Sequence, residues 1–282
     1  MSNGSIIQHK VKAGDTLGAI ARDRGVSINA ILAINPQITD PNLIFIGQKI
    51  LIPVAGVEQP TGQLAGGILK GLDAAVNLTQ KATCLRNQGF DFAMRYYNIS
   101  NSQTFPEKRL TMTEAKALVS AGFLLGVVFQ QAGNAIGGFD RDTGVRHGKR
   151  AHDLAVNSIG QPAGSAIYFS VDFDASASQI DGRITNYFKG VRDAMAQANG
   201  GAPRYQIGVY GSGLTCSKLF EKGLVSLTWL AQSMGFRGSR EFAEQKRFNL
   251  RQFLPKDKCG IDHDPNDTNP DKPSGLFTIP VA

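Results

Sequence analysis

The sequence of 282 residues contains little of what marks disulfide-rich, membrane-spanning or disordered proteins. Its three cysteines, Cys84, Cys216 and Cys259, are odd in number and widely spaced, and none belongs to a CxxC pair. This pattern predicts free thiols rather than a disulfide framework or a cysteine metal site. No run of about 18 apolar residues occurs, so we expect no stable insertion into a membrane. A hydrophobic content of 42% excludes a disordered or collagen-like chain.

Positive charge is in modest excess, with 30 basic and 23 acidic residues and a net charge of +7. Such an excess favours a polyanionic partner such as a nucleic acid, an anionic membrane or a charged cell wall. The sequence has no basic block with interleaved aromatics, so we predict no nucleic-acid partner. The first ten residues lack the positive start and apolar stretch of a signal peptide. We therefore expect synthesis in the cytoplasm without such a peptide.

Residues 8–53 have the pattern of a small independent unit. A short strand around residues 6–11 is followed by two segments with apolar residues at helical spacing, and residues 47–53 form a closing strand. Asp15 stands where the cap of the first helix is expected. The predicted order is strand, helix, helix, strand.

The stretches HKVKAGDTLGAIARDRG, INP and LIFIGQKILIP in this unit resemble a LysM module. The resemblance implies a βααβ fold that binds glycans containing N-acetylglucosamine in a shallow groove between two loops. Two of the groove positions named next, Leu17 and Ile44, could alternatively be core residues that bind no glycan. Carried onto this sequence, the groove positions are Gly14, Asp15, Thr16 and Leu17, facing Asn42, Leu43, Ile44 and Phe45.

From about residue 84 onward, strand-like and helix-like patterns alternate, which predicts an α/β fold with parallel strands. A (β/α) TIM-like barrel is the preferred architecture, and a doubly wound open sheet is the alternative. The predicted domains are a LysM module over 1–54, a linker over 55–80 and the barrel over 81–282. The strands are expected at residues 90–97, 124–130, 166–173, 206–210, 228–232 and 247–253.

Carboxylates cluster where these predicted strands end. In the run YFSVDFD, side chains alternate between faces, so Asp172 and Asp174 share one face. Like charges held this close raise at least one pKa, as glycoside hydrolysis requires. The alternative is that these carboxylates are solvated and cap the next helix. Asp91 lies between two phenylalanines with Arg95 on its face, and Asp262 follows the last strand.

A second resemblance covers about residues 84–275. The motifs GFDFAMRYYN, IYFSVDFDAS, IGVYGSG, TWLAQS, LRQFLP and GIDHDPND resemble the glycoside-hydrolase-like domain once listed as a domain of unknown function, which is related to the family 25 lysozymes. The resemblance implies a TIM-like barrel with an acidic cleft formed by Asp91, Asp172, Asp174 and Asp262. Asp174 stands where the lysozymes carry a glutamic acid, which makes its reach to the glycosidic oxygen shorter by one methylene.

The other candidate residues are polar or aromatic side chains on the predicted strands. Trp229 is expected to line a sugar cleft, and core packing is an alternative that fits it nearly as well. His147, His152 and His263 lack metal-binding spacing, so we predict no metal and no cofactor. The predicted substrate-binding residues of the barrel are Arg95, Tyr210, Gln232 and Gln252.

Together these features predict a muramidase-like peptidoglycan hydrolase that a LysM module holds on the wall. Asp174 is the expected general acid and Asp172 the stabilising carboxylate, with Asp91 and Asp262 as electrostatic or base partners. The alternative is a peptidoglycan-binding protein that has lost catalysis. Delivery to the periplasm or wall is expected through a phage holin, as for an endolysin, or through a secretion system of type VI, with an immunity protein or adaptor as partner.

Deleting residues 1–54 is expected to weaken binding to insoluble peptidoglycan and to leave cleavage of soluble fragments largely intact, because the barrel is predicted to have its own core. Co-sedimentation with purified peptidoglycan and product analysis on soluble fragments measure the two effects. A truncated barrel that does not fold would contradict the two-domain prediction.

Overall fold

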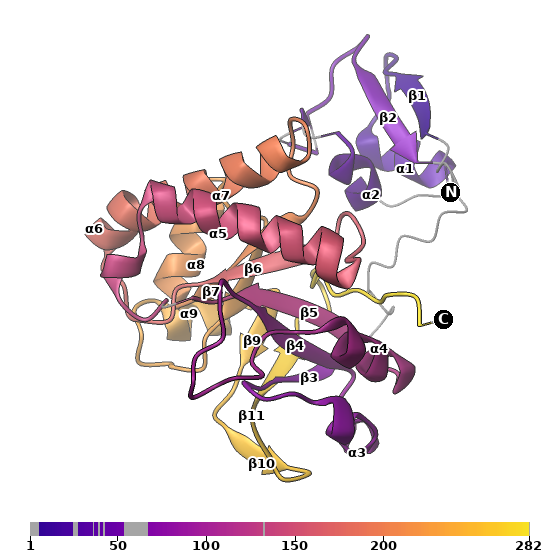
Figure 1. The fold of residues 1–282 in the computed structure, drawn as a ribbon. Coiled ribbons are helices and arrows are strands. Elements are labelled where there is room, and N and C mark those ends of the chain that lie inside the picture. The colour runs from indigo at the N-terminus through magenta and orange to yellow at the C-terminus, as the bar shows by residue number, and fades with distance from the viewer. Residues whose placement is uncertain are drawn as a thin grey trace. The chain divides into compact units, whose positions relative to one another are not determined.

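The structure is a computed structural model of the chain. It describes residues 6–24, 28–35, 37–38, 40–41, 43–53, 67–131 and 133–281. The chain divides into two compact units, one up to residue 60 and one from residue 61, and Figure 1 shows the fold of each. Most of the expected linker (55–66) and the groove residue Asn42 lie outside the described residues.

The first unit has the βααβ order that the sequence predicts. Its strands pair antiparallel, with Gln8 opposite Leu51. Ile31, Ile50 and Ile52 are fully buried between the helices and the strands. The elements are β1 (Ile6–Lys10), α1 (Leu17–Asp23), α2 (Ile28–Ala33) and β2 (Lys49–Pro53).

One buried amide joins the second helix of this unit to its last strand. Asn35 is fully buried and donates from Nδ2 to the carbonyl oxygens of Ile31 and Leu51, both at 2.6 Å, while its Oδ1 accepts from the Leu51 amide at 2.8 Å. Every polar atom of the side chain is therefore satisfied, as burial requires.

The start of α1 differs from the expectation. Asp15 accepts from His9 Nε2 at 2.7 Å and from the Lys12 amide at 2.8 Å, so it stabilises the preceding turn. The hydroxyl of Thr16 accepts from the Ala19 amide at 3.1 Å and fills the capping role instead.

The second unit is a closed barrel. Seven neighbouring strands run parallel, from β3 to β9, and β11 runs antiparallel between β9 and β3 to close the ring. This confirms the mixed α/β barrel predicted from sequence and excludes the open doubly wound sheet. The barrel strands are β3 (Lys70–Asp73), β4 (Phe92–Tyr97), β5 (Leu124–Phe129), β6 (Ala166–Ser170), β7 (Gln206–Gly211), β8 (Leu227–Leu230), β9 (Leu250–Gln252) and β11 (Ile261–Thr268).

The barrel begins earlier in the chain than the sequence indicated. Residues 70–73 form β3, which pairs in parallel with β4 and antiparallel with β11. The expected linker over 55–80 therefore includes a barrel strand, and residue 81 is not the first residue of the fold. The strand was overlooked because it is only four residues long and begins with Lys70-Gly71, residue types that are poor indicators of a strand.

The barrel also departs from a regular repeat at its last strand. After β9 the chain makes a hairpin of β10 (Lys256–Lys258) and β11 instead of a crossover helix, and Figure 1 shows this hairpin projecting from the barrel. A hairpin reverses direction, so β11 is necessarily antiparallel to β9.

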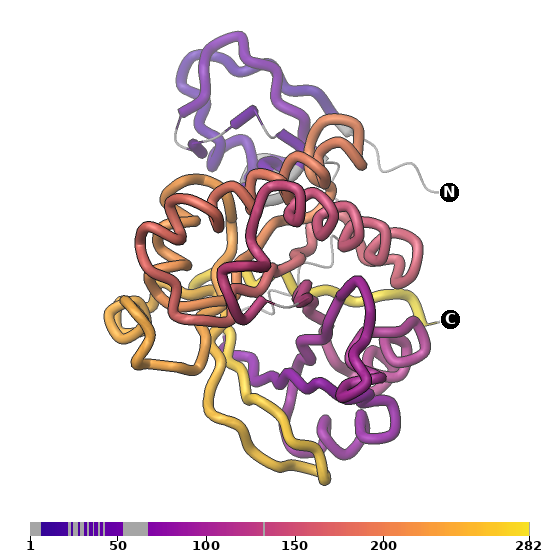
Figure 2. The backbone as a smooth tube through the Cα atoms, turned by 60° about the vertical axis from the view of Figure 1, so that its left-hand side comes forward, coloured from indigo at the N-terminus to yellow at the C-terminus, as the bar shows by residue number. Residues whose placement is uncertain are grey.

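Helices cover the outside of the barrel. The longest two, α5 and α7, lie side by side, as both Figure 1 and Figure 2 show. A Cβ on Gly144 would lie 2.0 Å from the Tyr187 backbone oxygen, so glycine permits this close approach. The helical segments are η1 (Thr79–Lys81), α3 (Ala82–Asn87), α4 (Met112–Ser120), η2 (Ile136–Gly138), α5 (Arg141–Asp153), η3 (Leu154–Ile159), α6 (Ala177–Gln179), η4 (Ile180–Ile184), α7 (Thr185–Ala198), α8 (Gly213–Glu221) and α9 (Ser239–Glu244).

Side chains of each strand alternate between the barrel lumen and the layer under the helices. In β4, Phe92 and Met94 belong to the lumen cluster, whereas Ala93 and Tyr97 belong to the larger cluster beneath the helices. Large lumen side chains fit because facing positions are glycine; a Cβ on Gly71 would lie 2.3 Å from the Phe92 ring. The lumen is therefore packed below its mouth.

A buried ion pair fixes the outer face of β4. Arg95 and Glu114 are both fully buried, with Arg95 Nε 2.7 Å from Glu114 Oε1. The same guanidinium donates to the carbonyl of Ala74, and Glu114 accepts from the Leu78 amide at 2.8 Å. The pair thus joins β4, α4 and the segment after β3.

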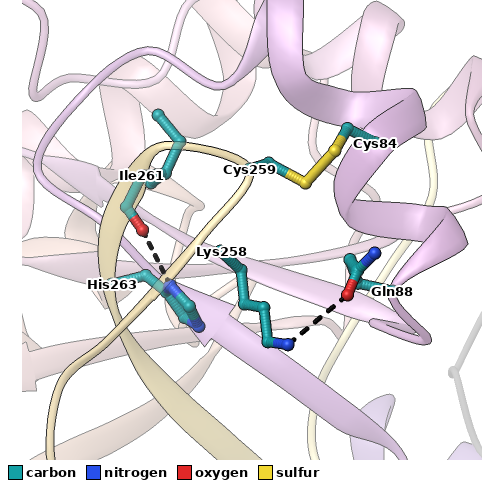
Figure 3. Close-up of a disulfide and its surroundings, with 6 residues drawn as sticks. All are labelled: Cys84, Gln88, Lys258, Cys259, Ile261 and His263. Atoms are coloured by element: carbon teal, nitrogen blue, oxygen red, sulfur yellow. Dashed lines mark hydrogen bonds between the residues drawn. A yellow bond between two sulfur atoms is a disulfide. The ribbon is translucent and has the colours of Figure 1, made fainter.

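The cysteines correct one expectation. Cys84 of α3 and Cys259 of the β10–β11 turn form a disulfide across 175 residues of sequence, while Cys216 is a buried free thiol. Figure 3 shows the bond joining the helix to the turn, with Lys258 beside Gln88. Sequence spacing gave no sign of this bond because the two cysteines come together only when β11 returns to the first strand.

Replacing Arg95 by Met is expected to lower the free energy of unfolding by about 3–5 kcal/mol, because Glu114 is left buried without its cation. The partly exposed pair of Arg86 and Asp91, 2.8 Å apart, offers a control, and Arg86→Met should cost less than about 1 kcal/mol because water screens this pair. Urea unfolding measures both. Equal losses in the two variants would contradict the role given to the buried pair.

Candidate active site

A cavity of about 240 Å³ lies where the parallel strands end, at the mouth of the lumen. Three carboxylates line it: Asp73 at the end of β3, Asp172 just after β6 and Asp264 on β11. The side chains around them are mainly polar or aromatic. The other lining residues are Tyr96, Lys108, Val128, Gln130, Ser170, Tyr210, Trp229, Gln232 and Gln252.

Asp73 is the most buried of the three carboxylates, with 2% of its surface exposed. It accepts three hydrogen bonds, from the Tyr96 hydroxyl at 2.8 Å, from Gln252 Nε2 at 2.9 Å and from Asn266 Nδ2 at 2.8 Å. Burial raises the pKa of Asp73, and the three donors oppose that rise because they favour the ionised form.

The two amides that hold Asp73 are themselves held in one orientation. Gln252 Oε1 accepts from the Tyr210 hydroxyl at 2.8 Å, and Asn266 Oδ1 accepts from Trp229 Nε1 at 2.8 Å. The oxygen of each amide therefore faces a donor, and each NH₂ group is directed at Asp73.

Asp264 lies beside Asp73 and shares one hydrogen-bond donor with it. Its Oδ2 accepts from the same Gln252 Nε2, at 3.1 Å. Burial and the neighbouring carboxylates raise the pKa of Asp264 to about 7. One carboxyl of the cavity is therefore protonated in a large part of the molecules at neutral pH, while Asp73 is surrounded by donors that suit an ionised group.

Asp172 and Lys108 form the third side of the cavity. Gln130 joins them, because its Nε2 donates to Asp172 Oδ2 at 3.2 Å and its Oε1 accepts from Lys108 Nζ at 2.6 Å. The Lys108 ammonium lies 4.2 Å from the centre of the Tyr96 ring. Burial raises the pKa of Asp172 and lowers the pKa of Lys108.

Four residues predicted from sequence lie in this cavity: Asp172, Tyr210, Gln232 and Gln252. Trp229, for which cleft and core were left open, serves both: it is 1% exposed, packs against Tyr210 with ring centres 4.8 Å apart, and lines the cavity.

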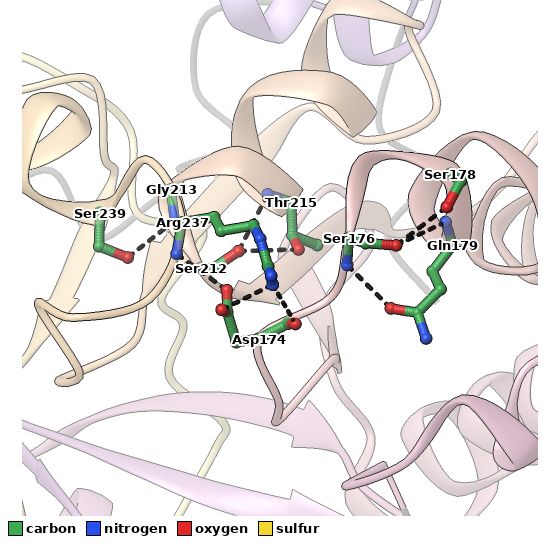
Figure 4. A network of polar contacts seen from close by, with 9 residues as sticks. All are labelled: Asp174, Ser176, Ser178, Gln179, Ser212, Gly213, Thr215, Arg237 and Ser239. Atoms are coloured by element: carbon green, nitrogen blue, oxygen red, sulfur yellow. Dashed lines mark hydrogen bonds and ion pairs between the residues drawn. The ribbon is translucent and has the colours of Figure 1, made fainter.

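Asp174 does not line the cavity, which corrects its expected placement. Arg237 holds it: NH1 lies 2.7 Å from Asp174 Oδ2, and the Arg237 amide donates to Oδ1 at 2.8 Å. Figure 4 shows the guanidinium against the carboxylate. The alternation that places Asp174 beside Asp172 applies only within a strand, and β6 ends at Ser170.

Three further placements are corrected by the structure. Asp91 precedes β4 at the opposite end of the barrel and pairs with Arg86. Arg95 is on the same face of β4 as the other odd-numbered residues. That face points to the helices and not to the lumen, and there Arg95 binds Glu114. Asp262 is exposed, two residues before Asp264 on β11, and does not line the cavity.

The predicted groove of the first unit lies on its surface. Gly14 and Thr16 are exposed and Asp15 is half-buried, whereas Leu17 is 1% exposed and belongs to the core. Backbone hydrogen bonds from Val11 to Gln48 and from Gly47 to Val11 bring the loop before α1 beside the loop before β2. In the second loop Leu43 is 56% exposed and Ile44 is partly buried against the core.

Sequence reasoning missed Asp73, Asp264, Tyr96 and Lys108 as cavity residues. Asp264 was visible as a second acidic residue after the last strand, and parity places it on the same face as Asn266. Asp73 could have been found from the run Gly71-Leu72-Asp73, because a short apolar stretch that ends in a carboxylate is a weak indication of a strand with an acid at its end. Lys108 lies in a loop, and periodicity gives no signal there.

No metal site emerges from the described residues: none of their His, Cys, Asp and Glu side chains form a group of three or more able to hold an ion. The expected absence of a metal and a cofactor stays a prediction. Within the same residues, no helix is long and apolar enough to cross a membrane.

Comparisons with known proteins agree with both parts of the chain. A family model described as Rv2525c-like, glycoside hydrolase-like domain matches residues 83–264, and the LysM model matches residues 9–53. Both resemblances found in the sequence are thereby confirmed.

Individual relatives cover parts of the chain. The uncharacterized protein YbfG of Bacillus subtilis is 32% identical over 64% of this chain and 25% of its own length. The structure of the Tat-secreted protein Rv2525c of Mycobacterium tuberculosis shares the fold, with a TM-score of 0.59 and 23% identity over 72% of this chain and 95% of that one. The endolysin of Bacillus phage PZA is 50% identical over 15% of this chain and 16% of its own length. The chain spans less than a third of the length of the curated relatives it matches.

The Asp264 carboxyl is expected to titrate near pH 7, as carbon-13 NMR of labelled aspartates can measure. Replacing Asp73 by Asn should lower that pKa because a neighbouring negative charge disappears. The control Asp181→Asn, which removes an exposed carboxylate paired with Lys218, should leave it unchanged. A raised pKa means that this carboxyl favours folding below about pH 4 and that the contribution is lost as the pH rises to about 7. An Asp264 carboxyl that titrates near pH 4 would contradict the described electrostatics.

Proposed function

Because the chain belongs to the Rv2525c-like, glycoside hydrolase-like family and carries a LysM domain, we propose that it is a peptidoglycan hydrolase with muramidase-like activity. The single observation that carries this proposal is the cavity at the barrel mouth, where Asp73, Asp172 and Asp264 converge. Glycoside hydrolysis needs one carboxyl that is protonated and another that is ionised. The different surroundings of Asp73 and Asp264 supply such a pair.

Asp264 is the proposed general acid, in place of Asp174. Its pKa near 7 keeps it partly protonated at neutral pH, so it can donate a proton to the leaving glycosidic oxygen. Asp73, held by three donors, is the proposed ionised partner that stabilises positive charge on the sugar. Asp172, oriented by Gln130, is the proposed second stabilising carboxylate or base.

The LysM domain is proposed to hold the barrel on its substrate. Its exposed Leu43 and Phe45 flank Ile44 in the loop before β2 and offer apolar surface to sugar rings. A second binding module raises the effective concentration of glycan at the barrel, so a small cavity suffices for turnover. The net charge of +7 adds attraction to an anionic wall, and salt weakens this term.

The proposed place of action is the cell wall. The Cys84–Cys259 disulfide supports action in an oxidising compartment, since such bonds persist outside the reducing cytoplasm. Of the two delivery roles predicted from sequence, the endolysin role is supported by the LysM likeness to the endolysin of phage PZA. A role as an injected effector, with an immunity protein or adaptor, is the alternative proposal.

One observation favours a second candidate function, a peptidoglycan-binding protein without activity. Arg237 is hydrogen-bonded to both carboxylate oxygens of Asp174. In the resemblance to the family 25 lysozymes, Asp174 stands at the position of their catalytic acid. If Asp264 cannot replace that acid, the barrel binds glycan and releases it uncut.

Digestion of purified peptidoglycan, followed by mass spectrometry of reduced products, tests the proposal. The wild-type protein should generate new reducing ends at N-acetylmuramic acid. The variants Asp73→Asn and Asp264→Asn should lose at least about 100-fold in rate, the usual loss when an acid–base group is removed. The wild-type rate should fall above about pH 7, as Asp264 loses its proton.

Asp257→Asn is the matched control, since it removes an exposed carboxylate on β10 of the same hairpin that does not line the cavity. It should retain wild-type activity. Binding without any product would favour the second candidate function. A larger loss in Asp174→Asn than in Asp264→Asn would return the acid role to Asp174.

A further inference from the structure

A second cavity, of about 400 Å³, adjoins the first on the side of the loops that follow β4 and β5. Amide and hydroxyl side chains provide most of its lining. The two cavities share only Lys108, Gln130 and Asp172 among their lining residues. Any ligand that extends from one cavity into the other therefore passes these three side chains.

Asn98 places an unsatisfied acceptor in this second cavity. It is 2% exposed, yet its Oδ1 has no hydrogen-bond partner. The orientation of the amide is fixed by Asn101, whose Oδ1 accepts from Asn98 Nδ2 at 2.8 Å and from the Arg109 amide at 3.1 Å. Because Asn101 cannot turn without losing these contacts, the Asn98 oxygen is the atom left for a ligand.

Gln131 supplies the complementary donor. Its Oε1 accepts from the backbone amides of Ile99 and Ser100, at 3.0 Å and 3.2 Å. The oxygen end of Gln131 is thereby engaged, which leaves its NH₂ end for a ligand in the cavity that this residue lines. A buried acceptor and a donor in one small cavity match the N–H and C=O groups of an acetamido substituent.

An aromatic ring and an ammonium complete this surface. Phe105 lines the cavity and is 43% exposed, so one side of its ring is open to a sugar. The Lys108 ammonium lies 5.7 Å from the centre of that ring and 4.2 Å from the centre of the Tyr96 ring. Because Lys108 lines both cavities, its ammonium can donate a hydrogen bond to a ligand at their junction.

We propose that the second cavity is a subsite for an N-acetylated hexosamine ring, recognised by Asn98 and Gln131, and that the glycosidic bond to the next ring crosses at Lys108. The proposal rests on the proposed function, in that a glycan occupies the first cavity. It adds that the barrel binds at least two consecutive sugars.

The fluorescence of Trp229 can test the proposed subsite in the full chain. It is the only tryptophan in the sequence and it lines the first cavity, so its fluorescence reports binding to the barrel and not to the LysM domain. The probes are N-acetylglucosamine and its β-1,4-linked disaccharide. The disaccharide should bind about tenfold more tightly, because only it fills both cavities.

Two variants test whether the gain in affinity for the disaccharide comes from the second cavity. Asn98→Leu keeps the approximate shape of the side chain and removes the acceptor, and Phe105→Ala removes a ring that is 43% exposed. Each should abolish most of the gain for the disaccharide. Binding of the monosaccharide in the first cavity, which is the binding that Trp229 reports, should be unchanged. Phe220→Ala, which removes a ring 51% exposed on α8, should change neither.

Equal affinities for the two sugars, or a gain that survives in both variants, would overturn the subsite. Failure of the proposed function gives a different result: peptidoglycan remains uncut while the length-dependent gain persists. Mass spectrometry of the disaccharide after titration verifies that the affinities refer to the intact probe.

Discussion

The antiparallel pairing of β11 with both β9 and β3 is the constraint on which the rest of the barrel depends. This pairing brings Asp264 opposite Asp73 and Asn266 opposite Gly71 and Gln252. Asp73 of β3 is therefore hydrogen-bonded to Gln252 of β9 and Asn266 of β11, which are 179 and 193 residues away in the chain. The disulfide between Cys84 and Cys259 fixes the turn before β11 to α3 and restricts the same closure.

The hydrogen bonds around Asp73 explain why a cluster of acids is stable at this closure. Trp229 and Tyr210 orient two amides, and both amides donate to one carboxylate. These donors favour the ionised form of Asp73 and oppose the effect of its burial on the pKa, whereas Asp264 shares only one of them. The proton belongs preferentially to Asp264, because the group with fewer donors gains less from ionisation.

The sequence predicted the fold better than the site. Motif resemblance and alternating patterns gave the LysM unit and a barrel, because both depend on local periodicity. Within the site, Asp172 and Gln252 were found because they end or follow strands with a strong apolar signal. Asp91 and Arg95 were misplaced because parity shows that two residues share a face but not which face is inside. Asp174 was misplaced because its alternation was read beyond the end of β6, and Asp73 was missed because its strand is only four residues long.

A crystal structure of the chain with a bound tetrasaccharide of N-acetylglucosamine tests the central claim most directly. Consecutive rings are predicted in the two cavities, with a glycosidic oxygen at the junction formed by Lys108, Gln130 and Asp172, an Asp264 oxygen within hydrogen-bond distance of the sugar, and Arg237 still bound to Asp174. A glycan that bypasses Asp73 and Asp264 and displaces Arg237 from Asp174 would contradict the assignment of the site.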